Sequence, residues 1–286
     1  MCGVAASKAC RNSARNPLPP SLCSTRYKEG RAPHCPFDES CARRSSAAAE
    51  TRWLVRSVDI VNDFDAVWFD AGGVLVLPDP TVLAPLLEPY GGSVDLDRHR
   101  RAHYAAMAVK SHMEHGEDNW LAYDEAYVRS VGVRDHLVVL SSRLLSACRV
   151  PELWRWPIPD SVAAVRTLHL AGIPLAVVSN ASGQIAATLE MAQICQAGDG
   201  PCVPMRCIID SHVVGVAKPD PAIFDFAARY FEGIDRCRVI YVGDSVSIDV
   251  NGATAAGLRP VLLDPFDDHA GADFERIRSV GDLVGR

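Results

Sequence analysis

The 286 residues are 48% hydrophobic and 22% charged, enough apolar content for one substantial core or for a core plus a smaller module. No apolar run approaches the roughly 18 residues of a membrane span, and the first eight residues lack a secretory-type stretch, so a cytoplasmic location is expected. Residues 1–56 hold ten Lys or Arg and four Asp or Glu, a charge of +6 that leaves −12 for the remainder of a −6 chain, and this acidic remainder argues against nucleic-acid binding there.

Residues 1–58 show no sustained helical or strand periodicity. We predict that they form a disordered or spurious extension; the alternative is an organelle transit peptide, because the segment is basic and poor in acids. No Cys-x-x-Cys spacing occurs among the ten cysteines, so a zinc ribbon or thioredoxin-type site is not expected. Cys195, Cys202 and Cys207 could in principle meet around a metal, but buried or incidental thiols are favoured.

Helical patterns dominate the long interval in the first half of the chain. Residues 79–157 contain no convincing strand pattern, and glycines separate four helical patterns near 81–89, 95–114, 118–130 and 134–148. An interval of this length is too long for a loop, so we predict an inserted α-helical cap domain over 79–157. Trp120, Tyr123 and Tyr127 fall at i, i+3 and i+7, which favours cap core over a ligand-binding stripe.

Short apolar runs on both sides of this interval read as strands: Val67–Phe69, Pro174–Val178, Arg206–Ile209, Arg238–Val242 and Pro260–Leu263. Helical patterns near 160–171, 183–195, 219–231 and 249–256 separate the later ones. Alternation of this kind is typical of a parallel sheet flanked by helices. We therefore predict a Rossmann-like, three-layer α/β/α core formed by residues 59–78 and 158–286.

Polar residues follow several of these strands, and each has a simple explanation when taken alone. Asp70 precedes the Gly72-Gly73 turn and could be a nucleophile, a metal ligand or a turn-former. Ser179 could bind an anion with backbone N–H groups of the next helix, or act as an N-cap. Lys218 could neutralise carboxylates or be a solvated surface lysine.

Asp244 and Asp249 complete this set of polar residues. The carboxyl ends of parallel strands share one edge of a sheet, where open α/β folds bind ligands. Three carboxylates at such an edge repel one another unless cations lie among them. Lys218 and a Mg²⁺ ion would supply that compensation.

Together the segments resemble the four motifs of the haloacid dehalogenase-like hydrolase superfamily. The resemblance covers about residues 64–265 and rests on Phe69-Asp70-Ala71-Gly72-Gly73-Val74-Leu75, Ser179-Asn180, Lys218-Pro219 and Gly243-Asp244-Ser245 with Asp249. The helical insertion after the first motif resembles the cap of the first subclass of that superfamily.

The resemblance implies roles for individual residues. Asp70 would be the nucleophile that forms an aspartyl ester or aspartyl phosphate. Ser179 and Asn180 would bind the transferring group, and Lys218 would neutralise charge on the nucleophile and on phosphoryl oxygens. The Mg²⁺ ligands would come from Asp70, the Gly72 carbonyl and Asp244, and Asp249 would support the metal site or orient Lys218.

One position departs from the pattern. Phosphatases of the superfamily usually carry a second Asp two residues after the nucleophile, where this chain has Gly72. That Asp protonates the leaving oxygen, and such assistance is worth about 10²–10⁴-fold in rate. Leaving groups of low pKa would need little protonation, or a cap residue such as His99, His103, His112 or His115 could substitute for the acid, although a surface or structural role is favoured for each of these histidines.

The predicted function is a Mg²⁺-dependent phosphatase acting on a small phosphorylated metabolite. The alternatives are a hydrolase of the same fold that cleaves a different bond, such as a dehalogenase, and a catalytically weakened binding or regulatory protein. No nucleic-acid or membrane partner is expected, and the sequence does not indicate an oligomeric state.

Overall fold

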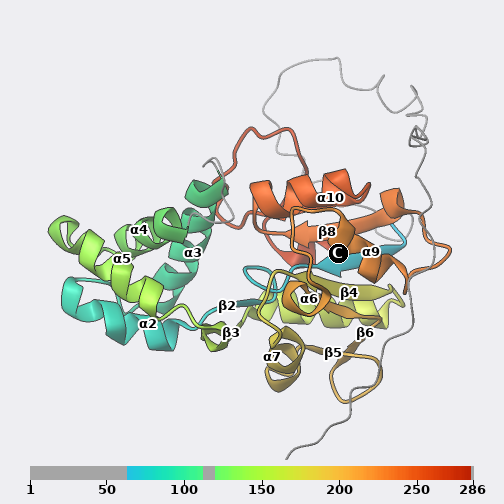
Figure 1. Cartoon of the computed structure of the whole chain (residues 1–286), viewed down its shortest axis with the longest axis horizontal. Helices are drawn as coiled ribbons and strands as arrows, with labels where there is room; N and C mark the ends of the chain where they lie inside the picture. Colours follow the sequence, from blue (N-terminus) through green and yellow to red (C-terminus); the bar gives the residue numbers. More distant parts are fainter. Residues whose placement is uncertain (1–62, 112–119, 285–286) are drawn as a thin grey trace, which may run out of the picture. The chain divides into compact units, whose positions relative to one another are not determined.

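The computed structural model describes residues 63–111 and 120–284 (Figure 1). The extension predicted for residues 1–58 lies outside the described residues, as do His112 and His115. No helix within the described ranges has both the length and the apolarity needed to cross a membrane.

A six-stranded parallel sheet carries the candidate site. Its order is β10-β9-β8-β1-β4-β7, and β1 is therefore an interior strand. The strands are β1 (Ala66–Phe69), β4 (Leu175–Ser179), β7 (Ile208–Asp210), β8 (Val239–Gly243), β9 (Arg259–Leu263) and β10 (Arg276–Ile277). All five predicted strands are present, and β10 is additional. Phe69 pairs with Val177 of β4 and with Val242 of β8, so the ends of these three strands lie at the same level.

Both faces of the sheet are covered by helices, because alternate residues of its buried strands point to opposite sides. In β1, Val67 and Phe69 belong to one apolar cluster, whereas Ala66 and Trp68 belong to another. The first cluster includes residues of α6 (Pro159–Leu170) and α7 (Ile185–Met191); the second includes residues of α9 (Ala222–Ala228) and α10 (Asn251–Ala255). The predicted three-layer α/β/α fold is confirmed (Figure 1).

The four helices predicted in the insertion are also present. They are α2 (Pro80–Leu87), α3 (Leu96–Ser111), α4 (Trp120–Ser130) and α5 (Val138–Ala147), and they lie together in Figure 1. Pro80 occupies the first turn of α2, and the Asp79 side chain accepts the Thr81 N–H as its N-cap. Tyr123 and Tyr127 are buried in the apolar cluster of these helices, and Trp120 packs against it. The division into core and cap domains at residues 79 and 157 stays a prediction.

The expectation that residues 79–157 contain no strand is wrong. β3 (Trp154–Pro157) pairs antiparallel with β2 (Val76–Pro78), at the start and end of the helical insertion. Each strand is short and ends in proline, and the partners are far apart in sequence, so no local pattern reveals the pairing. A second small pair, β5 (Cys195–Ala197) with β6 (Val203–Met205), was likewise not predicted.

Short elements complete the described chain. A four-residue helix, α8 (Ser211–Val214), follows β7, and a π-helical turn over Val246–Val250 precedes α10. Turns of 3-10 helix occur at Glu88–Tyr90, Asp135–Leu137, Pro151–Leu153, Arg236–Arg238 and Val280–Leu283.

Candidate active site

One cavity of about 300 Å³ brings together seven of the residues proposed from the sequence. Asp70 directly follows β1, Ser179 ends β4 and Asp244 directly follows β8, and these are the strand ends that the sheet register places side by side. The seven candidates that line the cavity are Asp70, Gly72, Ser179, Asn180, Lys218, Asp244 and Asp249. The structure thus confirms that they are neighbours, whereas their chemical roles stay predictions.

Lys218 is fully buried rather than solvated. Its Nζ lies 3.0 Å from Asp70 Oδ1 and 2.7 Å from Asp249 Oδ1. Burial alone would lower the pKa of the ammonium, but the Asp249 and Asp70 carboxylates outweigh burial and raise it. Lys218 is therefore a fixed cation between two carboxylates.

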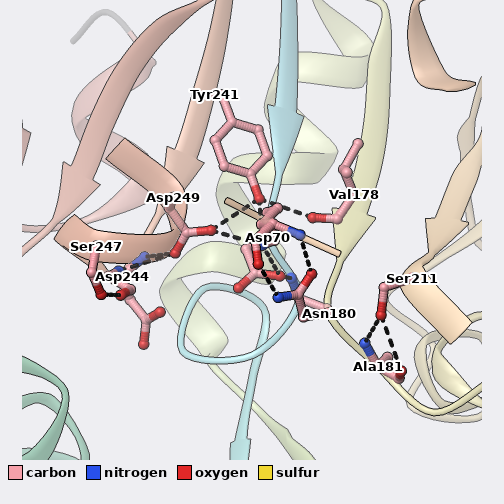
Figure 2. A network of polar contacts seen from close by, with 12 residues as sticks. Asp70, Val178, Asn180, Ala181, Ser211, Tyr241, Asp244, Ser247 and Asp249 are labelled. Atoms are coloured by element: carbon pink, nitrogen blue, oxygen red, sulfur yellow. Dashed lines mark hydrogen bonds and ion pairs between the residues drawn. The ribbon is translucent and has the colours of Figure 1, made fainter. Parts of the chain in front are cut away.

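Tyr241 joins the same network and was missed by the sequence analysis. Its hydroxyl accepts a 2.7 Å hydrogen bond from Lys218 Nζ and lies 2.9 Å from the Val178 carbonyl, to which it donates. Figure 2 shows Asp70, Tyr241 and Asp249 converging at this point. The available signal was a tyrosine inside the apolar strand β8, since a buried hydroxyl requires a polar partner.

Asp70 is held in an unusual electrostatic environment. Burial raises the pKa of its carboxyl group to about 7, Asp249 and Asp244 act in the same direction, and Lys218 opposes them. Oδ1 accepts a hydrogen bond from the Ala71 N–H at 2.7 Å and lies within ion-pair distance of Lys218. The negative charge of Asp70, Asp244 and Asp249 therefore exceeds the single positive charge of Lys218. This excess favours binding of an additional cation.

Asp249 differs from the other two carboxylates because both of its oxygens already accept hydrogen bonds from the protein. Oδ1 accepts from Lys218, and Oδ2 accepts from the backbone N–H groups of Asp244 at 3.2 Å and Ser245 at 3.0 Å. These contacts fix the loop that carries Asp244. Asp249 is accordingly placed to support Lys218 and Asp244.

The donor set fits a hard divalent cation. Asp70, Asp244 and Asp249 each offer a carboxylate oxygen, and these oxygens lie within 4.8 Å of one another. Mg²⁺ prefers oxygen ligands, commonly one or two carboxylates completed by water and substrate phosphate. The engagement of Asp249 favours Asp70 and Asp244 as the direct ligands. Participation of the Gly72 carbonyl stays a prediction.

Two of the four cap histidines proposed as substitutes can be placed. His103, on α3, is buried, with Nε2 2.9 Å from Asp244 Oδ2 and Nδ1 2.9 Å from the Tyr123 hydroxyl. His99 instead contacts the Tyr127 hydroxyl and the Ser93 carbonyl. Of these two, His103 is the histidine that contacts a carboxylate of the site.

Glycine at position 73 allows this close approach. Gly73 has a φ of +70°, a conformation that glycine adopts without strain. A side chain at that position would collide with the Asp244 carboxylate and would come within 2.8 Å of His103 Nε2. The Gly-Gly turn thus serves to seat Asp244 and His103 beside the first strand.

The neighbouring Gly72 is covered by an aromatic ring. A Cβ atom at this position would lie 3.1 Å from Trp154 Cζ3, tighter than ordinary van der Waals contact. Trp154 begins β3, the strand that the sequence analysis missed, and its side chain also lines the cavity. The Trp154 ring therefore occupies the space that a side chain at position 72 would need.

Asn180 is engaged with the backbone of Lys218. Its side-chain oxygen accepts the Lys218 N–H at 2.8 Å, and its amide nitrogen donates to the Lys218 carbonyl at 2.9 Å. This pair of bonds fixes the loop that delivers the lysine. Asn180 is thus suited to affect substrate binding indirectly, by holding Lys218 in position.

Backbone N–H groups of the loop after Ser179 are hydrogen-bonded to other parts of the protein. Ala181 donates to the Ser211 hydroxyl at 3.1 Å, and Gly183 and Ile185 donate to the Asp210 carboxylate (Figure 2 shows the Ser211–Ala181 contacts). These donors are therefore occupied, which disfavours the option that they bind an anion together with Ser179. The Ser179 hydroxyl remains the candidate anion ligand on this strand end.

The cysteines considered as metal ligands are free thiols. Cys195 and Cys207 are buried, and burial raises the pKa of each thiol to about 12. Within residues 63–111 and 120–284, the His, Cys, Asp or Glu side chains grouped closely enough to hold a metal are those of Asp70, Asp244 and Asp249. The interpretation of these cysteines as structural thiols is preferred.

Comparison with known proteins gives a consistent assignment. A family model described as haloacid dehalogenase-like hydrolase matches residues 64–257. Phosphoserine phosphatase from Thermus thermophilus is 31% identical over 147 residues, which are 50% of this chain and 55% of that protein. Pyrimidine 5'-nucleotidase YjjG from Escherichia coli is 45% identical over 56 residues, 20% of this chain and 25% of that protein.

These matches span little more than half of one curated relative and a quarter of the other. Among solved structures, a HAD phosphatase from Thermococcus onnurineus has 20% sequence identity and a TM-score of 0.47. That comparison covers 77% of this chain and 95% of the other.

Proposed function

Because the chain belongs to the haloacid dehalogenase-like hydrolase family, we propose that it is a Mg²⁺-dependent phosphatase of a small phosphorylated metabolite. The observation that carries this proposal is the buried Lys218 ammonium, held between Asp70 and Asp249 at the wall of a cavity. A phosphoserine phosphatase and a pyrimidine 5'-nucleotidase among the relatives support a phosphate-ester substrate.

In the proposed reaction, an Asp70 carboxylate oxygen attacks phosphorus and forms an aspartyl phosphate, while the bond from phosphorus to the substrate oxygen breaks. Lys218 and the Ser179 hydroxyl bind the phosphoryl oxygens. Asp70 and Asp244 would hold Mg²⁺, which neutralises charge on the nucleophile and on the phosphoryl group. Water then hydrolyses the aspartyl phosphate, releasing phosphate and regenerating the Asp70 carboxylate. Positioning and charge stabilisation are the main requirements of this chemistry.

Protonation of the leaving oxygen is the step for which the chain is least equipped. Glycine at position 72 provides no acid, so the departing alkoxide must take its proton from water or from another group. Esters whose leaving groups have a low pKa need little protonation. We therefore propose that activated esters are hydrolysed faster than simple alkyl phosphates.

The proposal is tested by turnover of a panel of phosphate monoesters by the full chain, with and without chelation of divalent metals. Phosphate release is expected in the presence of Mg²⁺, its loss with EDTA, and its return when Mg²⁺ is restored. Chloroacetate serves as the comparison substrate, because displacement of halide needs no metal to neutralise a phosphate. Metal-independent release of chloride without release of phosphate from any ester would overturn the proposal in favour of a dehalogenase.

Restoring the absent acid should change the preference among leaving groups. Because the Trp154 ring lies beside position 72, Gly72→Asp is combined with Trp154→Ala, and Trp154→Ala alone is the matched control. We expect kcat for alkyl phosphates to rise about 10–100-fold over the control, and kcat for p-nitrophenyl phosphate to change much less. Equal gains for both substrates would show that leaving-group protonation is not the limitation.

We also propose that the protein is located in the cytoplasm. Cysteines at five positions in the described residues are free thiols: Cys148, Cys195, Cys202, Cys207 and Cys237. A reducing compartment maintains cysteines in this state.

A further inference from the structure

The wall of the cavity contributed by the helical insertion carries two cations on one aromatic ring. Lys110, near the end of α3, is 1% exposed, and its Nζ lies 3.8 Å from the centre of the Trp120 ring. Arg149, just after α5, has its Cζ 4.5 Å from the same ring centre. All three side chains line the cavity that contains Asp70. Two positively charged side chains thus lie at this wall of the cavity.

The distribution of charge around the cavity is asymmetric. The carboxylates that line it are Asp70 and Asp244, which directly follow strands β1 and β8, and Asp249, which lies in the π-helical turn after β8. In the described part of the helical insertion, the charged side chains that line the cavity are Lys110 and Arg149. The rest of that wall is apolar and is formed by Met107, Trp120, Val150, Pro151 and Trp154.

Arg149 is held in place from behind. Its guanidinium pairs with Asp124 of α4, whose side chain is 1% exposed, while the Arg149 side chain keeps 18% exposure. The packing of both cations against Trp120 further restricts their positions. Two cations in such fixed positions suit recognition of an anionic ligand group, because little side-chain entropy remains to be lost on binding.

We infer that the substrate carries a second anionic group besides its reacting phosphate, and that Lys110 and Arg149 bind this group. The second group is a carboxylate or another phosphate, attached through a short linker that contacts the apolar wall. A cavity of about 300 Å³ limits the ligand to a small metabolite. This inference rests on the proposed phosphatase function, since the reacting phosphate is taken to lie at Asp70.

Matched pairs of esters test the inference with the wild-type chain. Phosphoglycolate is compared with ethyl phosphate, and propane-1,3-diol bisphosphate with propyl phosphate, so that the two arms separate a carboxylate from a second phosphate. We expect kcat/KM to be at least tenfold higher for the doubly anionic member of one pair. Equal values within both pairs would overturn the inference.

Substitutions of Lys110 and Arg149 then test whether these two cations cause the preference for the doubly anionic ester. Lys110→Met keeps the length of the side chain and removes its charge. Arg149→Met is made together with Asp124→Asn, so that no buried carboxylate loses its partner. Each is expected to lower kcat/KM for the preferred ester about 10–100-fold, the usual worth of a charge-assisted hydrogen bond, with less than twofold change for its singly anionic partner. Arg129→Met, which removes a cation that does not line the cavity, should change neither value.

A parallel fall for both members of a pair would show that these residues serve folding or the reacting phosphate instead. Failure of the phosphatase proposal itself is recognised by a binding measurement that requires no turnover. Isothermal titration calorimetry compares the affinity for phosphonoacetate with that for methylphosphonate, which lacks the carboxylate and therefore has no second anionic group. If the protein hydrolyses no ester yet binds phosphonoacetate at least tenfold more tightly, and Lys110→Met removes that preference, the proposed function fails and the second-anion site stands.

Discussion

Asp70→Asn is expected to abolish phosphate release and, in the metal-free protein, to increase the free energy of unfolding at pH 8. The first effect follows from removal of the proposed nucleophile. The second follows from the pKa of the Asp70 carboxyl group, which burial and the neighbouring carboxylates raise from its ordinary 3.8 to about 7 in the folded protein. An asparagine carries no charge in this buried position and therefore avoids the unfavourable charged state.

The sign of the pH dependence follows from proton binding. Between about pH 4 and pH 7 the folded state holds a proton on Asp70 that the unfolded state has lost, so the wild type loses stability as the pH rises through this range. The difference between the two pKa values corresponds to about 4 kcal/mol, and loss of the contact with Lys218 offsets part of the gain in the variant.

Urea denaturation in EDTA at pH 4 and pH 8 measures this effect. The advantage of Asp70→Asn over the wild type should be largest at pH 8 and small at pH 4. Asp135→Asn, which alters a carboxylate that is 97% exposed, is the matched control and should show little difference at either pH. An Asp70→Asn protein that is less stable than the wild type at pH 8 would contradict the raised pKa.

Lys218→Met is expected to have the largest effect on stability. Removal of the ammonium leaves Asp70 and Asp249 close together without their shared cation. Loss of one partner from a buried ion pair costs about 3–5 kcal/mol, because the remaining charge is buried and uncompensated. We expect a loss of this size in the free energy of unfolding at pH 8, together with loss of phosphate release.

A double-mutant cycle identifies the cause of that loss. In Lys218→Met combined with Asp70→Asn, one of the uncompensated carboxylates is gone, so Asp70→Asn should stabilise the Lys218→Met variant at pH 8 by more than it stabilises the wild type. Additive effects of the two substitutions would show that the charges of Lys218 and Asp70 do not interact appreciably.

The sheet and the strand-end residues were predictable because their signals are local. A short apolar run followed directly by Gly and Asp, as at Val239–Asp244, indicates a buried strand that delivers a carboxylate to the edge of a sheet. Since parallel strands align their carboxyl ends, the same pattern also predicts that Asp70, Ser179 and Asp244 are neighbours. The register of Phe69 with Val177 and Val242 confirms that arrangement.

The features that were not predicted depend on contacts between distant segments. Trp154 covers Gly72 only because β3 returns to pair with β2 after the helical insertion, and no pattern within either strand indicates this pairing. Similarly, His103 could not be chosen among four histidines until the packing of α3 placed it against Asp244. The spacing of Trp120 with Tyr123 and Tyr127 predicts a core residue, yet the Trp120 ring also faces the cavity and two cations.

The interior position of β1 has a consequence for how the chain acquires its structure. The strand that presents Asp70 pairs with β4 on one side and with β8 on the other, and β8 is separated from it by more than half of the chain. During synthesis, β1 and the helices that follow it leave the ribosome long before β8 exists. Such non-local pairings form slowly because a long loop must close first. Until Val239–Gly243 has been made, β1 keeps one unpaired edge, and nascent chains that stop before β8 are expected to expose an aggregation-prone strand.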